Sequence, residues 1–123
     1  MNDRPVGFFD SGVGGLGVWR ETVRLLPRES TVYLGDDANC PYGEKSPEEV
    51  RELAFAQTRR LLELGCKAVV VACNTATAAA IDDLRREFPE VPFVGMEPAV
   101  KPAALSSKSG VVGVLATRGT FNG

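Results

Sequence analysis

The stretch that decides the fold is VGFFDSGVGGLGV, residues 6–18. Its apolar start is typical of a buried strand, and the residues that follow it have the pattern of a helix. Between the two lies G-x-G-x-x-G, from Gly12 to Gly17, which is also the pattern that opens dinucleotide-binding domains. Three interpretations are open: the glycines bind a pyrophosphate, they only permit a tight turn, or their exposed amides bind a substrate carboxylate.

Acidic residues near the glycines help to distinguish these interpretations. Asp36 and Asp37 follow a second apolar run, about 20 residues on, where a dinucleotide-binding domain has the acid that binds the ribose. Asp10, in contrast, stands two residues before the first glycine and would repel a pyrophosphate. The polar loop DDANCPYG at 36–43 is also long, and its Pro41 and Tyr42 have no role in the dinucleotide fold. A substrate carboxylate is therefore the favoured ligand for the loop amides.

Apolar runs alternate with amphipathic stretches along the chain, and this rhythm predicts the fold class. Strands are expected at 5–9, 30–35, 67–72, 92–95 and 110–116, and helices at 15–26, 46–65, 73–88 and 98–105. Ser46, Pro47 and Glu49 form the start signal of the second helix, a capping box with proline at the first helical position. The alternation predicts an α/β fold with a doubly wound parallel sheet. The sheet is expected to be incomplete, because the chain ends soon after the last strand.

The composition is that of an ordinary globular protein. The chain has 123 residues, 44% of them hydrophobic and 24% charged, and a net charge of −2. This charge gives neither a basic surface for nucleic acid nor a polybasic patch for a membrane. The longest purely apolar run, 68–73, is too short to span a bilayer, and the N-terminus has no signal core. We therefore expect a cytoplasmic protein whose three cysteines are thiols.

The residue types available limit the chemistry. Histidine is absent, which excludes Ser-His-Asp and Cys-His catalysis within this chain and argues against a zinc site. No lysine is placed as a pyridoxal Schiff base would require, since Lys67 lies at the wrong end of its strand. We expect neither a cofactor nor a metal ion.

Cys73 is the most informative single residue. It follows the apolar run 67–72 and precedes a helix, so it lies at the carboxyl end of a strand, where open α/β sheets bind ligands. A helix N-terminus stabilises a thiolate, so a lowered pKa is expected for this thiol. The alternative is a buried structural cysteine. The polar residues Asn74 and Thr75 directly after it argue for a site, because a core would not contain them.

The order of the strands decides which polar residues share a site. In the flavodoxin-like order 2-1-3-4-5 the first strand lies between the second and third, and neighbouring strands are about 4.8 Å apart. Asp10, Tyr42 and Cys73 each follow one of these strands, so this order brings them to one cleft. In the order 3-2-1-4-5, Asp10 would lie farther from Cys73. We expect the flavodoxin-like order.

Four linked motifs, FDSGVGGLGV, CPYGEKSPEEV, VVACNTATAAAI and VGMEPAVKPA, resemble the first half of the glutamate racemases. These are cofactor-independent enzymes of the aspartate/glutamate racemase superfamily that make D-glutamate for peptidoglycan. The resemblance implies that residues 1–97 form the first racemase domain and 98–123 the start of a truncated second domain. It also implies a second thiol, in a Gly-Cys-Thr-His motif of the missing half, so this chain alone is not expected to racemise glutamate.

The resemblance implies roles for individual residues. Cys73 would be one of two catalytic thiols and would move the α-proton on one face of the substrate. Asp10 would also be catalytic, polarising the amino group or assisting the proton transfer. The residues that would bind the substrate are Asp10, Ser11, Tyr42, Gly43, Asn74 and Thr75, with Thr117 as a further candidate for the side-chain carboxylate.

Some features depart from the family pattern or have no site role. Asp37, Asn39 and Cys40 differ from the residues that relatives commonly carry in this loop, which leaves aspartate as an alternative substrate to glutamate. For the complete protein, a homodimer is compatible with the resemblance. Cys66 is expected to pack in the core, and Trp19 to be a core or interface anchor. A solvated helix face is expected for the charged pairs Asp82-Asp83 and Arg85-Arg86.

Overall fold

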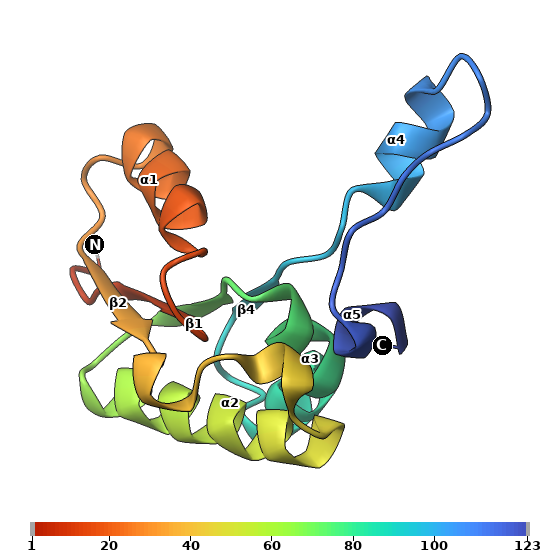
Figure 1. Ribbon diagram of the computed structural model, residues 1–123. Helices are drawn as coiled ribbons and strands as arrows, with labels where there is room; N and C mark the ends of the chain where they lie inside the picture. Colours follow the sequence, from red (N-terminus) through yellow and green to blue (C-terminus); the bar gives the residue numbers. More distant parts are fainter. Residues whose placement is uncertain (1, 123) are drawn as a thin grey trace.

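The computed structural model describes residues 2–122 and contains a four-stranded parallel sheet in the order β2-β1-β3-β4 (Figure 1). This is the predicted flavodoxin-like order, as far as four strands define it. The register aligns Phe8 of β1 with Tyr33 of β2 and with Val70 of β3. Because the strands are parallel, their carboxyl ends meet at one edge. The strands are β1 (Val6–Asp10), β2 (Thr31–Gly35), β3 (Ala68–Val71) and β4 (Phe93–Gly95).

Helices cover both faces of the sheet, with α2 and α3 on one face and α1 on the other (Figure 1). The start of α2 confirms the predicted capping box, since Ser46 Oγ accepts the Glu49 N–H at 3.2 Å and Pro47 is the first helical residue. The helices are α1 (Leu16–Leu25), α2 (Pro47–Glu63), α3 (Asn74–Glu87), α4 (Val100–Ser106) and α5 (Arg118–Asn122), with short 3-10 turns η1 (Asp37–Asn39) and η2 (Tyr42–Glu44).

Two hydrophobic cores hold these layers together. The larger lies under α2 and α3, where Phe9, Leu61 and Leu84 are fully buried. The smaller lies under α1 and is built on Phe8, with Trp19 packed against it. The indole Nε1–H of Trp19 donates to Thr31 Oγ1 at 2.9 Å, which confirms the packing role expected for this tryptophan. None of the helices between residues 2 and 122 is long and apolar enough to cross a membrane.

The C-terminal segment differs from the prediction. Residues 110–116 form no strand, and α5 follows them where no helix was expected. In this segment Val111 is 78% exposed and Leu115 fully exposed. The chain leaves the sheet after β4 and α4 extends away from it (Figure 1), so the segment has no neighbouring strand. The predicted strand is therefore wrong: the apolar, β-branched composition favours a strand, but a strand forms only when a partner lies beside it.

A buried threonine in α2 provides a test of the core. Thr58 is fully buried, and its hydroxyl has no hydrogen-bond partner in the described part of the chain. We expect Thr58→Val, which keeps the shape and removes the unpaired hydroxyl, to raise the free energy of unfolding by about 1 kcal/mol in urea titrations.

The matched control is Thr77→Val in α3. The Thr77 hydroxyl is also buried, but it donates to the Cys73 carbonyl at 2.9 Å and accepts the Met96 N–H at 3.0 Å. Its loss is expected to cost about 1–3 kcal/mol. A similar loss in both variants would contradict the assignment of Thr58 as unpaired.

Candidate functional site

A cavity of about 360 Å³ lies at the carboxyl edge of the sheet and contains most of the predicted site residues. Asp10 ends β1 and Cys73 follows β3, and these strands are neighbours. Asn74 and Thr75 begin α3 and line the same cavity, and Thr117 closes it from the C-terminal segment. The strand order therefore brings Asp10, Cys73, Asn74 and Thr75 together as predicted, whereas Thr117 comes from a segment that forms no strand.

The carboxylate of Asp10 accepts hydrogen bonds from backbone amides of the glycine loop. The carboxylate is 5% exposed; Oδ1 accepts the Ser11 N–H at 2.7 Å and Oδ2 accepts the Gly15 N–H at 2.6 Å. The Gly15 amide therefore binds a carboxylate of the protein itself, and neither the substrate carboxylate that the sequence favoured nor the pyrophosphate that this loop holds in a dinucleotide-binding domain. The half-buried Ser11 remains beside the site, with its hydroxyl 3.5 Å from Asp10 Oδ1.

Asp36, the candidate ribose-binding acid, is also hydrogen-bonded by side chains of the protein itself. Its carboxylate is 7% exposed and accepts hydrogen bonds from the Tyr42 hydroxyl at 2.5 Å and from Asn39 Nδ2 at 2.9 Å. A ribose would have to displace both partners from a buried acid. The geometry of Asp10 and Asp36 together does not support the dinucleotide interpretation.

Tyr42 and Gly43 lie beside the cavity rather than in it. The Tyr42 ring is buried, and its pKa is raised first by burial and then by the hydrogen bond to Asp36. Its hydroxyl donates to Asp36, and Tyr42 does not line the cavity. A Cβ on Gly43 would lie 2.7 Å from Thr117 Cγ2, so the glycine allows Thr117 to approach. Gly43 lines a second cavity of about 710 Å³, which it shares with Thr75.

Cys73 is a buried thiol at the start of α3. Its Sγ accepts the Ala76 N–H at 3.4 Å, so the helix N-terminus acts on it as predicted. The net effect on its pKa is nevertheless the opposite of the predicted one: burial raises the pKa more than the hydrogen bonds from Ala76 and Ser11 lower it, and the Asp10 charge raises it further. The expectation of a lowered pKa was wrong because the sequence predicts the helix N-terminus but not how deeply the thiol is buried.

The influence of Asp10 on this thiol can be measured. We expect Asp10→Asn to lower the pKa of Cys73, because removing a nearby negative charge favours the thiolate. The rate of Cys73 alkylation by iodoacetamide, followed by peptide mass spectrometry from pH 6.5 to 10.5, should then rise at lower pH than in the unmodified chain. Asp82→Asn, an equal charge change at an exposed position of α3, serves as the control. Equal profiles for the two variants would contradict the coupling.

Three threonine hydroxyls form one wall of the cavity. Thr75 Oγ1 lies 2.7 Å from Thr117 Oγ1, which in turn lies 3.0 Å from Thr120 Oγ1. All three residues line the cavity, and such hydroxyls are suited to donate to an anion. The sequence prediction did not include Thr120. The available signal was the T-x-x-T spacing at a helix start, where the Thr120 N–H donates to Thr117 Oγ1 at 3.3 Å.

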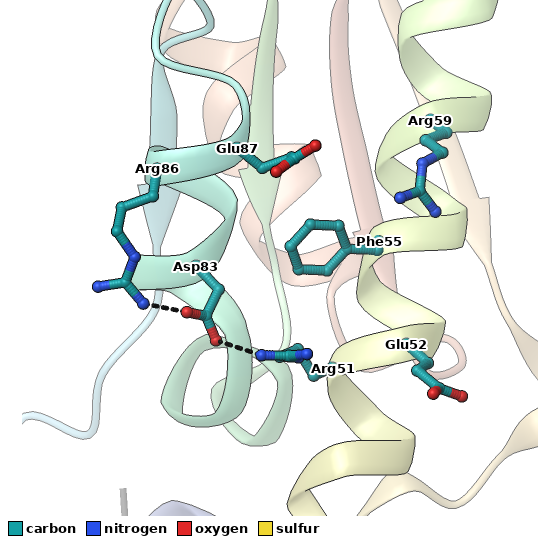
Figure 2. Close-up of a pocket in the computed structure, with 7 residues that line it drawn as sticks. All are labelled: Arg51, Glu52, Phe55, Arg59, Asp83, Arg86 and Glu87. Atoms are coloured by element: carbon teal, nitrogen blue, oxygen red, sulfur yellow. Dashed lines mark hydrogen bonds and ion pairs between the residues drawn. The ribbon is translucent and has the colours of Figure 1, made fainter.

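A separate groove of about 630 Å³ lies between the outer faces of α2 and α3 (Figure 2). The guanidinium groups of Arg59 and Arg51 stand 5.5 and 6.0 Å from the centre of the Phe55 ring. Asp83 pairs with Arg51 at 3.3 Å and with Arg86, and hydrogen bonding to Arg86 lowers its pKa (Figure 2). Asp82, Arg85 and Arg86 are exposed, as predicted for this charged face, and Asp83 in addition bridges α3 to α2. None of the predicted site residues lies in this groove.

The other two thiols lie away from the cavity lining. Cys66 is buried just before β3, where a Cβ on Gly7 would approach its Sγ to 2.9 Å, and burial raises its pKa. This agrees with the packing role predicted for it. Cys40 is exposed and faces Gly12. Within residues 2–122, no three or more Cys, Asp or Glu side chains gather as metal ligands would.

The family model and similar curated proteins agree on one family. A family model described as Asp/Glu/Hydantoin racemase matches residues 15–123. Proteins named glutamate racemase from Roseiflexus sp. (strain RS-1) and Ectopseudomonas mendocina (strain ymp) are 61% and 62% identical to this chain, each over 98% of it. These alignments cover 44% and 46% of the two relatives, so the chain spans about half the length of the curated relatives it matches.

Solved structures agree with the sequence relatives. The Escherichia coli glutamate racemase, in complex with L-glutamate and the activator UDP-MurNAc-ala, superposes with a TM-score of 0.88 at 45% identity, over 97% of this chain and 45% of that one. The Francisella tularensis enzyme, in complex with D-glutamate, gives 0.80 at 35% identity, over 99% of this chain and 46% of that one. The similarity thus extends over nearly the whole of this chain and less than half of either enzyme.

Proposed function

The chain belongs to the Asp/Glu/Hydantoin racemase family, and on this premise we propose that it forms the half of a glutamate racemase that carries one of two catalytic thiols. The observation that carries the proposal is the cavity in which Asp10 and Cys73 meet at the ends of neighbouring strands. The second thiol comes from a second half of the protein. This is supported by the relatives, of which this chain covers 44% and 46%.

In the proposed reaction the Cys73 thiolate removes the α-proton of glutamate from one face. The electron pair of the broken C–H bond remains on the α-carbon, and the proton is bound by sulfur. The other thiol then donates its proton to the opposite face, which inverts the centre. Asp10, beside Cys73, accepts a hydrogen bond from the substrate ammonium group. No cofactor and no metal ion takes part.

The substrate is proposed to be glutamate, which the E. coli and F. tularensis relatives contain in their solved structures. The hydroxyls of Thr75, Thr117 and Thr120 supply donors for one carboxylate of the substrate. The backbone at the N-terminus of α3, at Asn74 and Thr75, is suited to the other, because free helix amides and the helix dipole favour an anion. Thr120 joins the predicted substrate-binding residues in this proposal.

We propose the same division of domains as the sequence resemblance implies, 1–97 and 98–123. The departure of the chain from the sheet after β4 and the exposed Val111 and Leu115 support it, since these side chains lack the layer that would cover them in a complete second domain. The proposed role of the complete enzyme is the supply of D-glutamate for peptidoglycan in the cytoplasm. A homodimer of the complete protein is compatible with this proposal.

Glutamate binding by the chain itself tests the proposed site. Titration of D- and L-glutamate, followed by NMR shifts of the amides of residues 74 and 75, should show binding without net racemisation. We expect Thr117→Val to weaken the binding roughly 10- to 100-fold, the usual effect of losing a hydrogen bond to a charged group. Thr22→Val, which removes a hydroxyl of α1 that donates to the Val18 carbonyl, should leave the affinity unchanged. Equal affinities in both variants would contradict the assignment of Thr117.

A further inference from the structure

Tyr33 reaches the loop that holds Asp10, although it does not line the cavity. It lies in the middle of β2, opposite Phe8, on the face of the sheet that α1 covers. Its hydroxyl donates to the Gly12 carbonyl at 3.3 Å. A Cβ on Gly15 would come within 2.9 Å of the same hydroxyl oxygen. The end of the Tyr33 ring therefore contacts both the start and the end of the Gly12–Gly15 turn.

The same turn carries the hydrogen bonds of Asp10. The Ser11 and Gly15 amides bind the two carboxylate oxygens at 2.7 and 2.6 Å. Asp10 thus binds the amides of Ser11 and Gly15, and Tyr33 binds the Gly12 carbonyl, which lies between them in the chain. Asp10 also lines the cavity, so the residue that binds the turn is part of the site.

We propose that Tyr33 is a positioning residue for Asp10: its hydroxyl holds the Gly12–Gly15 turn, and the turn holds the Asp10 carboxylate beside Cys73. This inference rests on the proposed function, in which Asp10 binds the substrate ammonium group next to the thiol. Nothing in the sequence pattern marks Tyr33, since a tyrosine in a strand is ordinary; only the contact of its hydroxyl with the turn identifies it.

The protonation state of Tyr33 is suited to this role. Burial first, and then the charge of Asp10, raise its pKa to about 12, with a smaller contribution from the charge of Asp37. The hydroxyl therefore keeps its proton, and remains a donor, near neutral pH.

Hydrogen exchange provides the first test. In the 123-residue chain, Tyr33→Phe should speed exchange of the Ser11 and Gly15 amides roughly five- to tenfold, the effect of losing one neutral hydrogen bond that holds the turn. The phenylalanine ring keeps the packing on Phe8. The matched control is Thr31→Val, on the same face of the same strand, which removes the hydrogen bond from Trp19 but touches no part of the turn. In the control these two amides should exchange at the unmodified rate.

The pKa of Cys73 provides a second readout, which a purely structural role of Tyr33 would not move. Asp10→Asn is introduced with and without Tyr33→Phe, and the alkylation profile of Cys73 is measured for all four proteins. We expect the shift caused by Asp10→Asn to shrink at least by half when Tyr33→Phe is present, because a released carboxylate no longer stays beside the thiol. Other charged groups near the turn, such as Asp37, are the same in all four proteins.

The proposal is supported only if Gly15 exchanges faster and the effect of Asp10 on Cys73 shrinks. It is overturned if either quantity is the same in Tyr33→Phe as in the unmodified chain, or if Thr31→Val speeds the exchange of the Gly15 amide equally. Neither measurement involves glutamate. A negative result for Tyr33 therefore does not contradict the proposed function. Likewise, a failure to bind glutamate does not affect the outcome of the Tyr33 test.

Discussion

Replacing Cys73 with serine is expected to slow the exchange of the glutamate α-proton with solvent by about 10²–10⁴-fold, the usual contribution of a positioned base. A serine hydroxyl is far less acidic than a thiol and supplies almost no base near neutral pH. The measurement is the loss of the α-proton signal of D- and L-glutamate in D₂O, recorded by NMR with each enantiomer separately and with the 123-residue chain as the catalyst.

The handedness of this exchange adds a second expected result. A single thiol faces one side of the α-carbon, so it can exchange the proton only of the enantiomer that presents that proton to it. The deuteron returns from the same sulfur to the same face, and the configuration is retained. Exchange of one enantiomer without inversion is therefore the signature of a site that holds one of two thiols.

The control for this experiment is Cys66→Ala. Cys66 is also a buried thiol whose pKa is raised by burial, but it stands just before β3, at the other end of that strand from Cys73. Exchange should continue at the unmodified rate in this variant. An unchanged rate in Cys73→Ser, or an equal loss in both variants, would contradict the assignment of Cys73 as the base.

Much of the fold could be predicted from local signals in the sequence. The β-branched run before Cys73 and the capping box at Ser46 each depend on neighbouring residues, and both elements form as expected. The strand order was predicted because it brings Asp10 to Cys73, and the structure has it. The segment 110–116 was predicted wrongly, because a strand depends on a partner and the chain offers none beside it.

In the site, too, some features could be predicted from the sequence and others depend on the packed structure. Which residues gather at the sheet edge follows from strand order, so Asp10, Cys73 and Thr75 were predictable. The electrostatics were not, because the pKa of Cys73 is dominated by burial, which depends on the whole packed structure. The contact of the Tyr33 hydroxyl with the turn is of the same kind, since it depends on the pairing of β1 with β2.

The glycine pattern itself leads to the second large effect, which is expected for Gly15→Ala. A Cβ at this position would lie 2.8 Å from Ala72 Cβ, 2.9 Å from Tyr33 Oη and 3.0 Å from the Ala72 carbonyl oxygen. The backbone of Gly15 has φ −73°, which any residue can adopt, so the constraint is close approach alone. We expect the free energy of unfolding in urea to fall by about 1–3 kcal/mol, the usual cost of overpacking.

Gly17→Ala is the matched control, because it is the same substitution two residues on. No atom would lie within 4 Å of a Cβ at Gly17, and this residue is already inside α1. Alanine should therefore keep or raise the free energy of unfolding, by up to about 1 kcal/mol, because it favours the helix. Opposite signs for the two variants would show that Gly15 serves the approach of α1 to the sheet, whereas Gly17 serves no contact. Equal losses in the two variants would contradict this explanation, and would indicate that both glycines are needed for their backbone flexibility.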